Sequence, residues 1–259
     1  AYELNTTMPS WAISWDKSIS SDRRFFGLTT TAYTRAPSNY ALAANGIHHG
    51  TFRFEQGNPD LKPETAFEIR TSIKLSNFTH HLSLRVNSFA SLHKGFIHLK
   101  PTASFAPIAH GGQIYAFQAT DAFRTGLEMN VNFKKGKSLF TTTSSILGQW
   151  ALETGLGLPF TPPLDLFNSY SYSIRDNLSL TFSHRAIAPS FILARNEDFT
   201  EGVSLLGCEL KLNSDKEGTF QFKIDNILNR SWLDHISAYR ALGIVTQGRW
   251  WLLSWSKNI

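Results

Sequence analysis

The sequence predicts an all-β protein built from antiparallel strands, and two observations lead to this prediction. Apolar residues recur at every second position in segment after segment, which is the period of a strand with one apolar and one polar face. Helical periodicity is nearly absent, and no run approaches eighteen apolar residues, so a transmembrane helix is excluded. Only 17% of the 259 residues are charged, whereas 13% are aromatic, so the apolar content is high but divided into alternating pieces.

The alternating segments predict about twelve strands, of which the fourth is long and expected to bend. They lie near residues 11–19, 25–34, 67–75, 81–99, 114–119, 123–133, 138–150, 165–174, 178–185, 203–212, 219–228 and 250–256.

Three of these segments show the two faces most clearly. In residues 67–75 the odd positions are apolar except for a threonine, and the even positions are polar or charged: Glu68, Arg70, Ser72 and Lys74. In residues 123–133 one face carries Leu127, Met129, Val131 and Phe133. In residues 219–228 one face carries Phe220, Phe222, Ile224 and Leu228. A β-sandwich with one face in water shows this pattern, and so does a transmembrane β-barrel with lipid outside and a polar lumen.

Three features favour the transmembrane barrel over the sandwich. Tight turns at residues 134–137, 175–177 and 214–218 alternate with long links at 35–64, 100–113, 155–164, 186–202 and 229–248, as in outer-membrane barrels. Strands of about ten residues match a tilted span of a bilayer. Aromatic residues gather near strand ends, as in an interfacial girdle: Trp11, Trp15, Trp150, Trp250, Trp251 and Trp255.

Four stretches resemble TonB-dependent outer-membrane receptors. In residues 34–69, TRAPSNYALAANGIHHGTFRFEQGNPDLKPETAFEI, the family pattern is an Arg-x-Pro, an NG-H-T patch and then GNP-L-PE. The positions that fit it are Arg35, Pro37, Asn45, Gly46, His48, Gly50, Thr51, Glu55, Gly57, Asn58, Pro59, Leu61, Pro63 and Glu64. FIHLKPT (96–102) and IYAFQATDAFRTGLEM (114–129) resemble the middle of the same barrel, and IDNILNRSWLDHISAYRALGIVTQGRWWLLSWSKNI (224–259) resembles its last two strands. The likeness is strongest to the branch with zinc-type and related metal-uptake receptors.

The resemblance implies a 22-stranded barrel filled by an N-terminal plug domain. Residues 1–259 are then a single-domain, C-terminal part of that barrel, with about 12 strands and the plug domain absent. Its expected partners are outer-membrane lipid, the missing N-terminal barrel half and plug, and TonB–ExbB–ExbD through the plug. The chain departs from the family at its end, where Lys257, Asn258 and Ile259 replace the usual terminal aromatic residue.

The implied function is uptake of a scarce ligand across the outer membrane of a Gram-negative bacterium. The ligand would be a metal ion such as zinc, haem or a ferric siderophore, and no resident cofactor is required. A passive structural or adhesive outer-membrane barrel is one alternative, and a soluble β-sandwich binding module is another.

Other chemistry finds little support in the sequence. The net charge is +5, but the basic residues are scattered apart from KKGK at 134–137, so no nucleic-acid partner is expected. No G-x-S-x-G motif or phosphate-binding loop occurs, and Ser183 and His184 are neighbours whose side chains would face opposite ways on a strand. An enzyme is therefore not expected. Cys208 is the one cysteine, so no internal disulfide can form.

Candidate ligand-binding residues lie in the long links. Zinc needs three or four converging ligands, and the residues that could supply them are His48, His49, His98, His110, Glu55 and Asp121. The alternative is that these histidines bind no metal and are simply solvated or hydrogen-bonded. His48 and His49 are also expected to contact the ligand directly, since binding residues often lie on long loops of a rigid scaffold. A ferric siderophore would instead need aromatic and arginine side chains, for which the candidates are Arg35, Tyr40 and Tyr115.

Overall fold

Strands dominate the computed structural model, which describes residues 7–19, 23–77, 81–107 and 112–257. These residues form thirteen strands, one short α-helix and one 3-10 turn. The strands are β1 (Ser10–Ile19), β2 (Arg24–Arg35), β3 (Asn45–His48), β4 (Arg53–Gln56), β5 (Glu64–Leu75), β6 (Leu82–Phe105), β7 (Gln113–Lys135), β8 (Ser138–Ala151), β9 (Asp165–Arg175), β10 (Leu178–Ile187), β11 (Val203–Ser214), β12 (Gly218–Asp225) and β13 (Trp250–Ser256). The helix is α1 (Asn39–Ala43), and the 3-10 turn η1 covers Arg240–Leu242.

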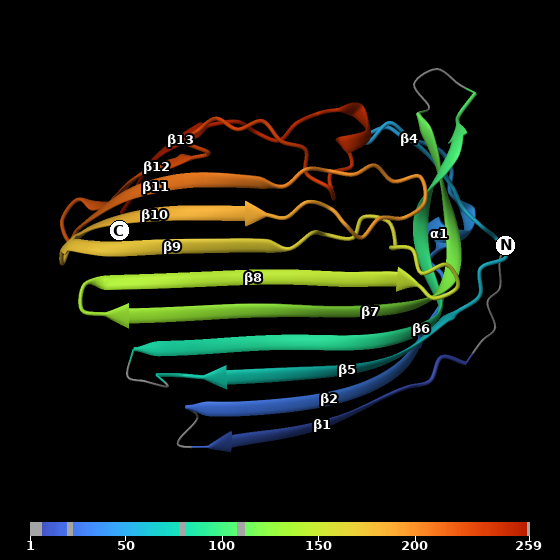
Figure 1. The fold of residues 1–259 in the computed structure, drawn as a ribbon, viewed down its shortest axis with the longest axis horizontal. Helices are drawn as coiled ribbons and strands as arrows, with labels where there is room; N and C mark the ends of the chain where they lie inside the picture. The colour runs from blue at the N-terminus through green and yellow to red at the C-terminus, as the bar shows by residue number, and fades with distance from the viewer. Residues whose placement is uncertain (1–6, 20–22, 78–80, 108–111, 258–259) are drawn as a thin grey trace.

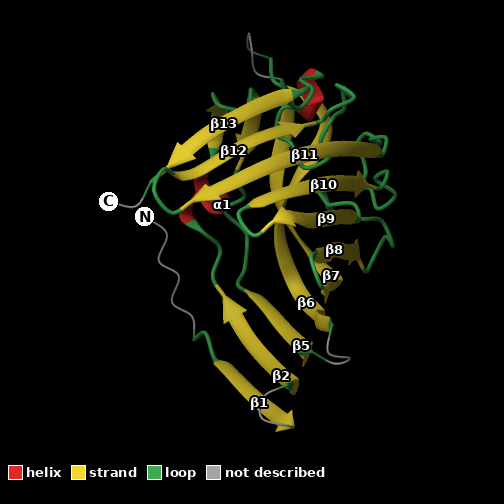
Figure 2. Ribbon diagram, turned by 90° about the vertical axis from the view of Figure 1, so that its left-hand side faces the viewer, coloured by secondary structure: helices red, strands yellow, loops and turns green. Residues whose placement is uncertain are grey.

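Eleven strands follow one another across a single sheet in the order β1-β2-β5-β6-β7-β8-β9-β10-β11-β12-β13. Every neighbouring pair on this path is antiparallel. The short β3–β4 hairpin lies off the path, and β4 pairs in parallel with the start of β7. The sheet curves strongly, with β1 and β13 at opposite edges (Figure 2), and no pairing within the described ranges joins those two strands. A single curved sheet confirms the predicted barrel portion and shows that the sandwich alternative is wrong.

The predicted alternation separates the two faces of this sheet. Glu68, Ser91, Arg124 and Gln149 lie opposite one another on β5, β6, β7 and β8, so they form one polar row. The row is on the concave face, whose hollow is lined by Arg124 of this row and by Arg70, which lies on the same face of β5 as Glu68. The convex face exposes large apolar side chains from nearly every strand, including Trp11, Ile13, Phe67, Ile69, Leu127, Phe133, Phe182, Phe220, Trp251 and Leu253.

The two ends of the sheet differ, as the turn lengths predict (Figure 1). At one end, here called the tight-turn end, a few residues join β7 to β8, β9 to β10 and β11 to β12. At the other, the long-loop end, lie four long links: loop 36–63, loop 152–164, loop 188–202 and loop 226–249. No helix among the described residues is long and apolar enough to cross a membrane.

The segments 114–119 and 123–133, predicted as two strands, are one continuous strand, β7. Asp121, which lies between the two predicted segments, is accommodated by a bulge in β6, where the register shifts between His93 and Phe96. Gly95 has φ +68° within this bulge, and its N–H donates to Asp121 Oδ1 at 2.8 Å. The bulge confirms the predicted bend. Because β6 runs on to Phe105, the link predicted as 100–113 is short.

Two further expectations are corrected near the C-terminal edge, and one hairpin in the first long loop is an addition. Strand β12 ends at Asp225, because Asn226 adopts φ +51° and its side chain binds the backbone N–H and C=O of Arg230, each at 2.8 Å. Leu228 therefore lies beyond the strand and is exposed. Trp250 lies opposite Asp225 and lines the concave face instead of joining the outer girdle with Trp251. The β3–β4 hairpin was not predicted.

Loop 36–63 folds into a small core at the long-loop end. Ser38 caps α1 by accepting the N–H of Ala41 at 3.1 Å, and the cluster consists of Ala41, Leu42 and Leu61 packed against Ile97 and Phe117. The GNPDLKPE segment then leads into β5, which begins at Glu64. The Glu64 carboxylate is buried, accepts the N–H of Ile97 at 3.1 Å and pairs with Arg35 at 3.1 Å.

Candidate functional site

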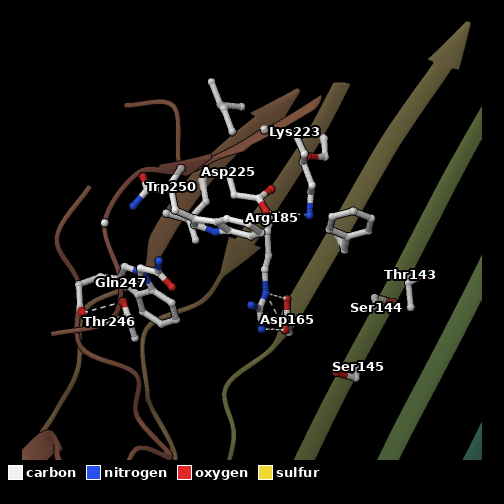
Figure 3. Close-up of a pocket in the computed structure, with 18 residues that line it drawn as sticks. Thr143, Ser144, Ser145, Asp165, Arg185, Lys223, Asp225, Thr246, Gln247 and Trp250 are labelled. Atoms are coloured by element: carbon white, nitrogen blue, oxygen red, sulfur yellow. Dashed lines mark hydrogen bonds and ion pairs between the residues drawn. The ribbon is translucent and has the colours of Figure 1, made fainter. Parts of the chain in front are cut away.

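The concave face forms a pocket of about 490 Å³ near the C-terminal edge of the sheet (Figure 3). Its floor comes from β8 to β12, and residues of loop 226–249, including Trp232, Thr246 and Gln247, line its other side. Arg185 binds Asp165 through two guanidinium nitrogens, with the Nη2–Oδ2 distance at 2.6 Å. The pocket therefore presents polar groups held in fixed positions to the hollow of the sheet.

A second ion pair and a glycine complete this floor. Lys223 Nζ lies 2.7 Å from Asp225 Oδ2 and 5.4 Å from the centre of the Trp250 ring. A Cβ atom on Gly207 would lie 2.9 Å from Asp225 Oδ1 and 2.4 Å from a serine hydroxyl on β10. The absence of a side chain at Gly207 thus lets the Asp225 carboxylate lie close to the sheet. Charges of both signs are paired here, so the pocket suits a polar ligand better than an ion.

His48 and His49 lie at the end of β3, in the turn that leads to β4, and both are exposed. His48 Nδ1 lies 3.2 Å from the hydroxyl of Thr51. Phe52 in the same turn adopts φ +53° and is 46% exposed. The turn belongs to the long-loop end, which is where the sequence places a ligand contact, and its imidazoles are open to solvent.

The structure does not gather the predicted metal ligands. No three His, Cys, Asp or Glu side chains in the described part of the chain lie close enough together to hold a metal ion. His98 lies with its ring stacked on Phe96 and its Nδ1 3.2 Å from the Phe96 carbonyl oxygen. The Asp121 carboxylate accepts the N–H of Gly95 in the β6 bulge, and His110 lies outside the described residues. A zinc site built from this set therefore stays a prediction.

Glu55 is buried and accepts a short hydrogen bond from the hydroxyl of Tyr40. This hydrogen bond, with burial second, raises the pKa of Tyr40 to about 12. The Tyr40 ring meets Phe117 edge to face, with 5.7 Å between ring centres. Glu55 thus holds α1 against β4 through this hydrogen bond, and Tyr40, which is 50% exposed, remains partly accessible to a ligand.

The other two siderophore candidates are also engaged. Arg35 pairs with Glu64 at 3.1 Å, although its own side chain remains 60% exposed. Tyr115 is only 4% exposed, stacks on Phe160 and lies beneath the Arg53 guanidinium at 4.6 Å. Arg35 therefore offers a charged edge to the concave face, whereas Tyr115 is a packing residue in this structure.

Sequence reasoning missed a buried ionic cluster at the long-loop end. Glu197 and His235 have side chains that are 0% and 1% exposed, and Arg240 lies 3.2 Å from Glu197. The three residues come from two loops separated by a strand pair, and each is an ordinary polar loop residue in the sequence. Their spacing along the chain carries no signal that they meet.

Comparisons with known proteins agree with this geometry. The family profile described as "TonB dependent receptor-like, beta-barrel" matches residues 2–224. A search of curated proteins finds no significant match.

Several solved structures share the fold at low sequence identity. The copper transporter OprC aligns with a TM-score of 0.80 and 14% identity over 95% of this chain and 39% of its own. The siderophore receptor PirA from Acinetobacter baumannii aligns with a TM-score of 0.64 and 17% identity over 93% of this chain and 39% of its own. The ferric-catecholate import receptor Fiu from E. coli K12 aligns with a TM-score of 0.63 and 16% identity over 94% of this chain and 34% of its own.

This chain therefore spans about two fifths of the length of these receptors. The profile match covers most of its residues, and the alternating antiparallel sheet agrees with it. The chain belongs to the family of TonB-dependent receptor β-barrels.

Proposed function

We propose that this chain is the C-terminal, single-domain part of an outer-membrane receptor that takes up a scarce ligand. The observation that carries the proposal is the polarity of the curved sheet. Its convex face exposes aromatic and aliphatic side chains along nearly every strand, and its concave face carries ion pairs and hydroxyls. Lipid outside and water inside give each face the solvent that it needs.

The long-loop end supports a receptor over a passive barrel. Four long links, the exposed imidazoles of His48 and His49, and the pocket roofed by loop 226–249 all lie at or near this end. Long outer loops are common to outer-membrane barrels, so the features that favour a receptor are the exposed imidazoles and the roofed pocket, since binding residues are concentrated on loops held by a rigid scaffold. We therefore place the ligand entrance at the long-loop end, facing the outside of the cell.

A metal ion such as zinc, haem or a ferric siderophore is the proposed ligand class. The names of the similar structures describe a copper transporter, a siderophore receptor and a ferric-catecholate receptor. In this chain a free metal would use imidazoles such as His48, whereas a siderophore would use Arg35 and the exposed side of Tyr40. Each group is a ligand contact for cargo and none is a resident cofactor.

The proposed partners follow from the two sheet edges. Unpaired backbone groups in lipid cost several kcal/mol each, so β1 and β13 require further strands. We propose that the remaining barrel strands pair with these two edges and that a plug domain fills the closed barrel. TonB–ExbB–ExbD would then couple to the receptor through the plug.

Membrane fractionation followed by ligand titration tests the proposal. The chain is expected in the outer-membrane fraction, resistant to carbonate extraction. The receptor reconstituted in detergent micelles from this chain, the remaining barrel strands and the plug is titrated with zinc, copper(II), haemin and a ferric catecholate, and saturable binding of at least one is expected. Recovery in the soluble fraction would contradict the membrane assignment. Membrane insertion without binding of any of the four would favour the passive barrel.

A further inference from the structure

The buried carboxylate of Glu197 joins three loops at the long-loop end. Its Oε1 accepts the N–H of Phe160 in loop 152–164 at 2.8 Å, and its Oε2 accepts the N–H of Ala194 at 3.0 Å. From loop 226–249, Arg240 Nη2 reaches Oε1 at 3.2 Å. Hydrogen bonds to an ionised buried group are stronger than those between neutral groups, so this carboxylate fixes all three loops relative to one another.

His235 completes the cluster, and its partners define where its proton is. Its Nδ1 lies 2.6 Å from Arg240 Nη1 and 3.0 Å from Thr200 Oγ1. A guanidinium nitrogen can only donate, so Nδ1 must accept and the imidazole proton is on Nε2. Nε2 lies 3.5 Å from Glu197 Oε1 and has no hydrogen-bond partner among the described residues. The cluster is therefore built for a neutral imidazole.

Strand β4 is attached to the same cluster through an arginine between two rings. Arg53 lies 4.6 Å from the ring centre of Tyr115 and 4.9 Å from that of Phe160, and its Nη2 donates to the carbonyl of Ala238 at 3.1 Å. The 3-10 turn that contains Arg240 lies beside β4 in the fold (Figure 1). Four segments far apart in sequence thus meet within one contact network.

We infer that Glu197, His235 and Arg240 form a latch that holds loops 152–164, 188–202 and 226–249 as one cap, which opens as a unit when His235 is protonated. A second proton would have to enter at Nδ1, directly against the Arg240 guanidinium. Two cations would then share the single buried carboxylate of Glu197. The inference deepens the proposed function, because loop 226–249 also roofs the concave pocket, so opening the cap would uncover that pocket.

The charged groups around His235 set the direction of the pH effect. Burial and then Arg240 lower its pKa from the ordinary value of 6.5, while Glu197 and Asp234 act in the opposite direction. Thr200 contributes only a hydroxyl. In an open cap the imidazole would be solvated and would bind protons near pH 6.5, so the open state binds more protons than the closed one. The closed cap is therefore favoured above about pH 6.5 and weakens as the pH falls below it.

Hydrogen–deuterium exchange of the full chain in micelles tests the inference. Peptides from the three loops are compared at pH 7.5 and 5.5, with rates corrected for intrinsic exchange. Exchange in all three loops is expected to rise together, by up to about tenfold, since a solvated imidazole is protonated in about ten of eleven molecules at pH 5.5. Unchanged protection in β9 and β10 shows that the sheet remains folded.

Two variants and one control make the result decisive. His235→Gln cannot titrate, so its three loops should exchange equally at both pH values, while Glu197→Gln should raise exchange in all three already at pH 7.5. The control is His184→Gln, because His184 lies on β10, outside the latch, and shares its hydrogen bond with Ser204 at 2.8 Å, so its pH response should match wild type. Loops that respond one by one, or a pH response that persists in His235→Gln, would overturn the latch. Neither outcome depends on ligand binding, so failure here would leave the proposed function standing.

Discussion

An arginine on the convex face of β7 should destabilise the membrane-inserted protein far more than one beside it on the concave face. Phe123, near the middle of β7, lies opposite Trp150 at the long-loop end of β8, and Phe133 lies opposite Phe140 at the tight-turn end. The two phenylalanines are ten residues apart, or roughly 34 Å along the strand. At a tilt of about 45° this spans roughly 24 Å, close to the apolar band of about 25 Å in outer-membrane barrels. Residue 128 then lies near the midplane.

Met129 and Asn130 are the matched pair, since they are neighbours at this depth and face opposite sides. Met129→Arg should lower the free energy of unfolding by about 2–4 kcal/mol, the cost of a cation near the midplane on the lipid face. Asn130→Arg should cost about 1–2 kcal/mol, because it loses the hydrogen bond that Asn130 donates to Thr143 at 3.0 Å and the one that it accepts from Asn132 at 2.6 Å, but keeps its charge in water. Urea unfolding from lipid vesicles, followed by tryptophan fluorescence, measures both. Equal destabilisation by the two variants would refute the assignment of faces.

Three other predictions concern the long-loop end. Gly57→Ala should lower the free energy of unfolding, measured by heat or urea, by about 1–3 kcal/mol, because its Cβ would lie 2.6 Å from a backbone nitrogen at the end of α1. The control Gly46→Ala has open space around its Cβ and should be nearly neutral. Equal destabilisation by the two variants would contradict the packing described. Tyr40→Phe should cost about 1–3 kcal/mol by leaving a buried carboxylate without its donor, and absorbance titration of wild type should show a tyrosine near pH 12 that the variant lacks. The double variant His48→Ala/His49→Ala should weaken zinc or haem binding by about tenfold. Wild-type binding should be weaker at pH 5.5 than at pH 7.5, because protonated imidazole cannot bind metal. Binding curves that are unchanged in the double variant would remove both histidines from the ligand site.

The presence of the strands and the side to which each residue points could be predicted from the sequence. Both depend on local alternation of apolar and polar residues, because the two faces of the sheet meet different solvents. The segment 67–75 is an example: its charged even positions lie on the concave face, as its period-two pattern requires. The sequence predicts β7 in two pieces, with Asp121 between them. The group that satisfies Asp121 is the N–H of Gly95 on β6, which no property of the β7 sequence reveals.

The loop contacts could not be predicted for a related reason. His235 and Glu197 meet only because two long loops fold over the same end of the sheet, and loop paths depend on tertiary contacts that have no periodic signal. The metal prediction for the histidines of the β3–β4 turn requires ligands from several loops to converge, and convergence between loops has no periodic signal in the sequence. Trp250 shows why the placement of aromatic residues is hard to predict. It is adjacent to Trp251 in the sequence, yet the two side chains lie on opposite faces of the sheet.

The central claim is that lipid covers the convex face of this sheet and water fills the concave one. Spin labels placed one at a time at residues 127–132, in a background where Cys208 is replaced by serine, measure this directly in vesicles. The account predicts a period of two along β7. Labels at the odd positions should collide mainly with oxygen dissolved in lipid, and labels at the even positions mainly with a water-soluble nickel reagent. Equal accessibility to the nickel reagent at all six positions would contradict the membrane barrel.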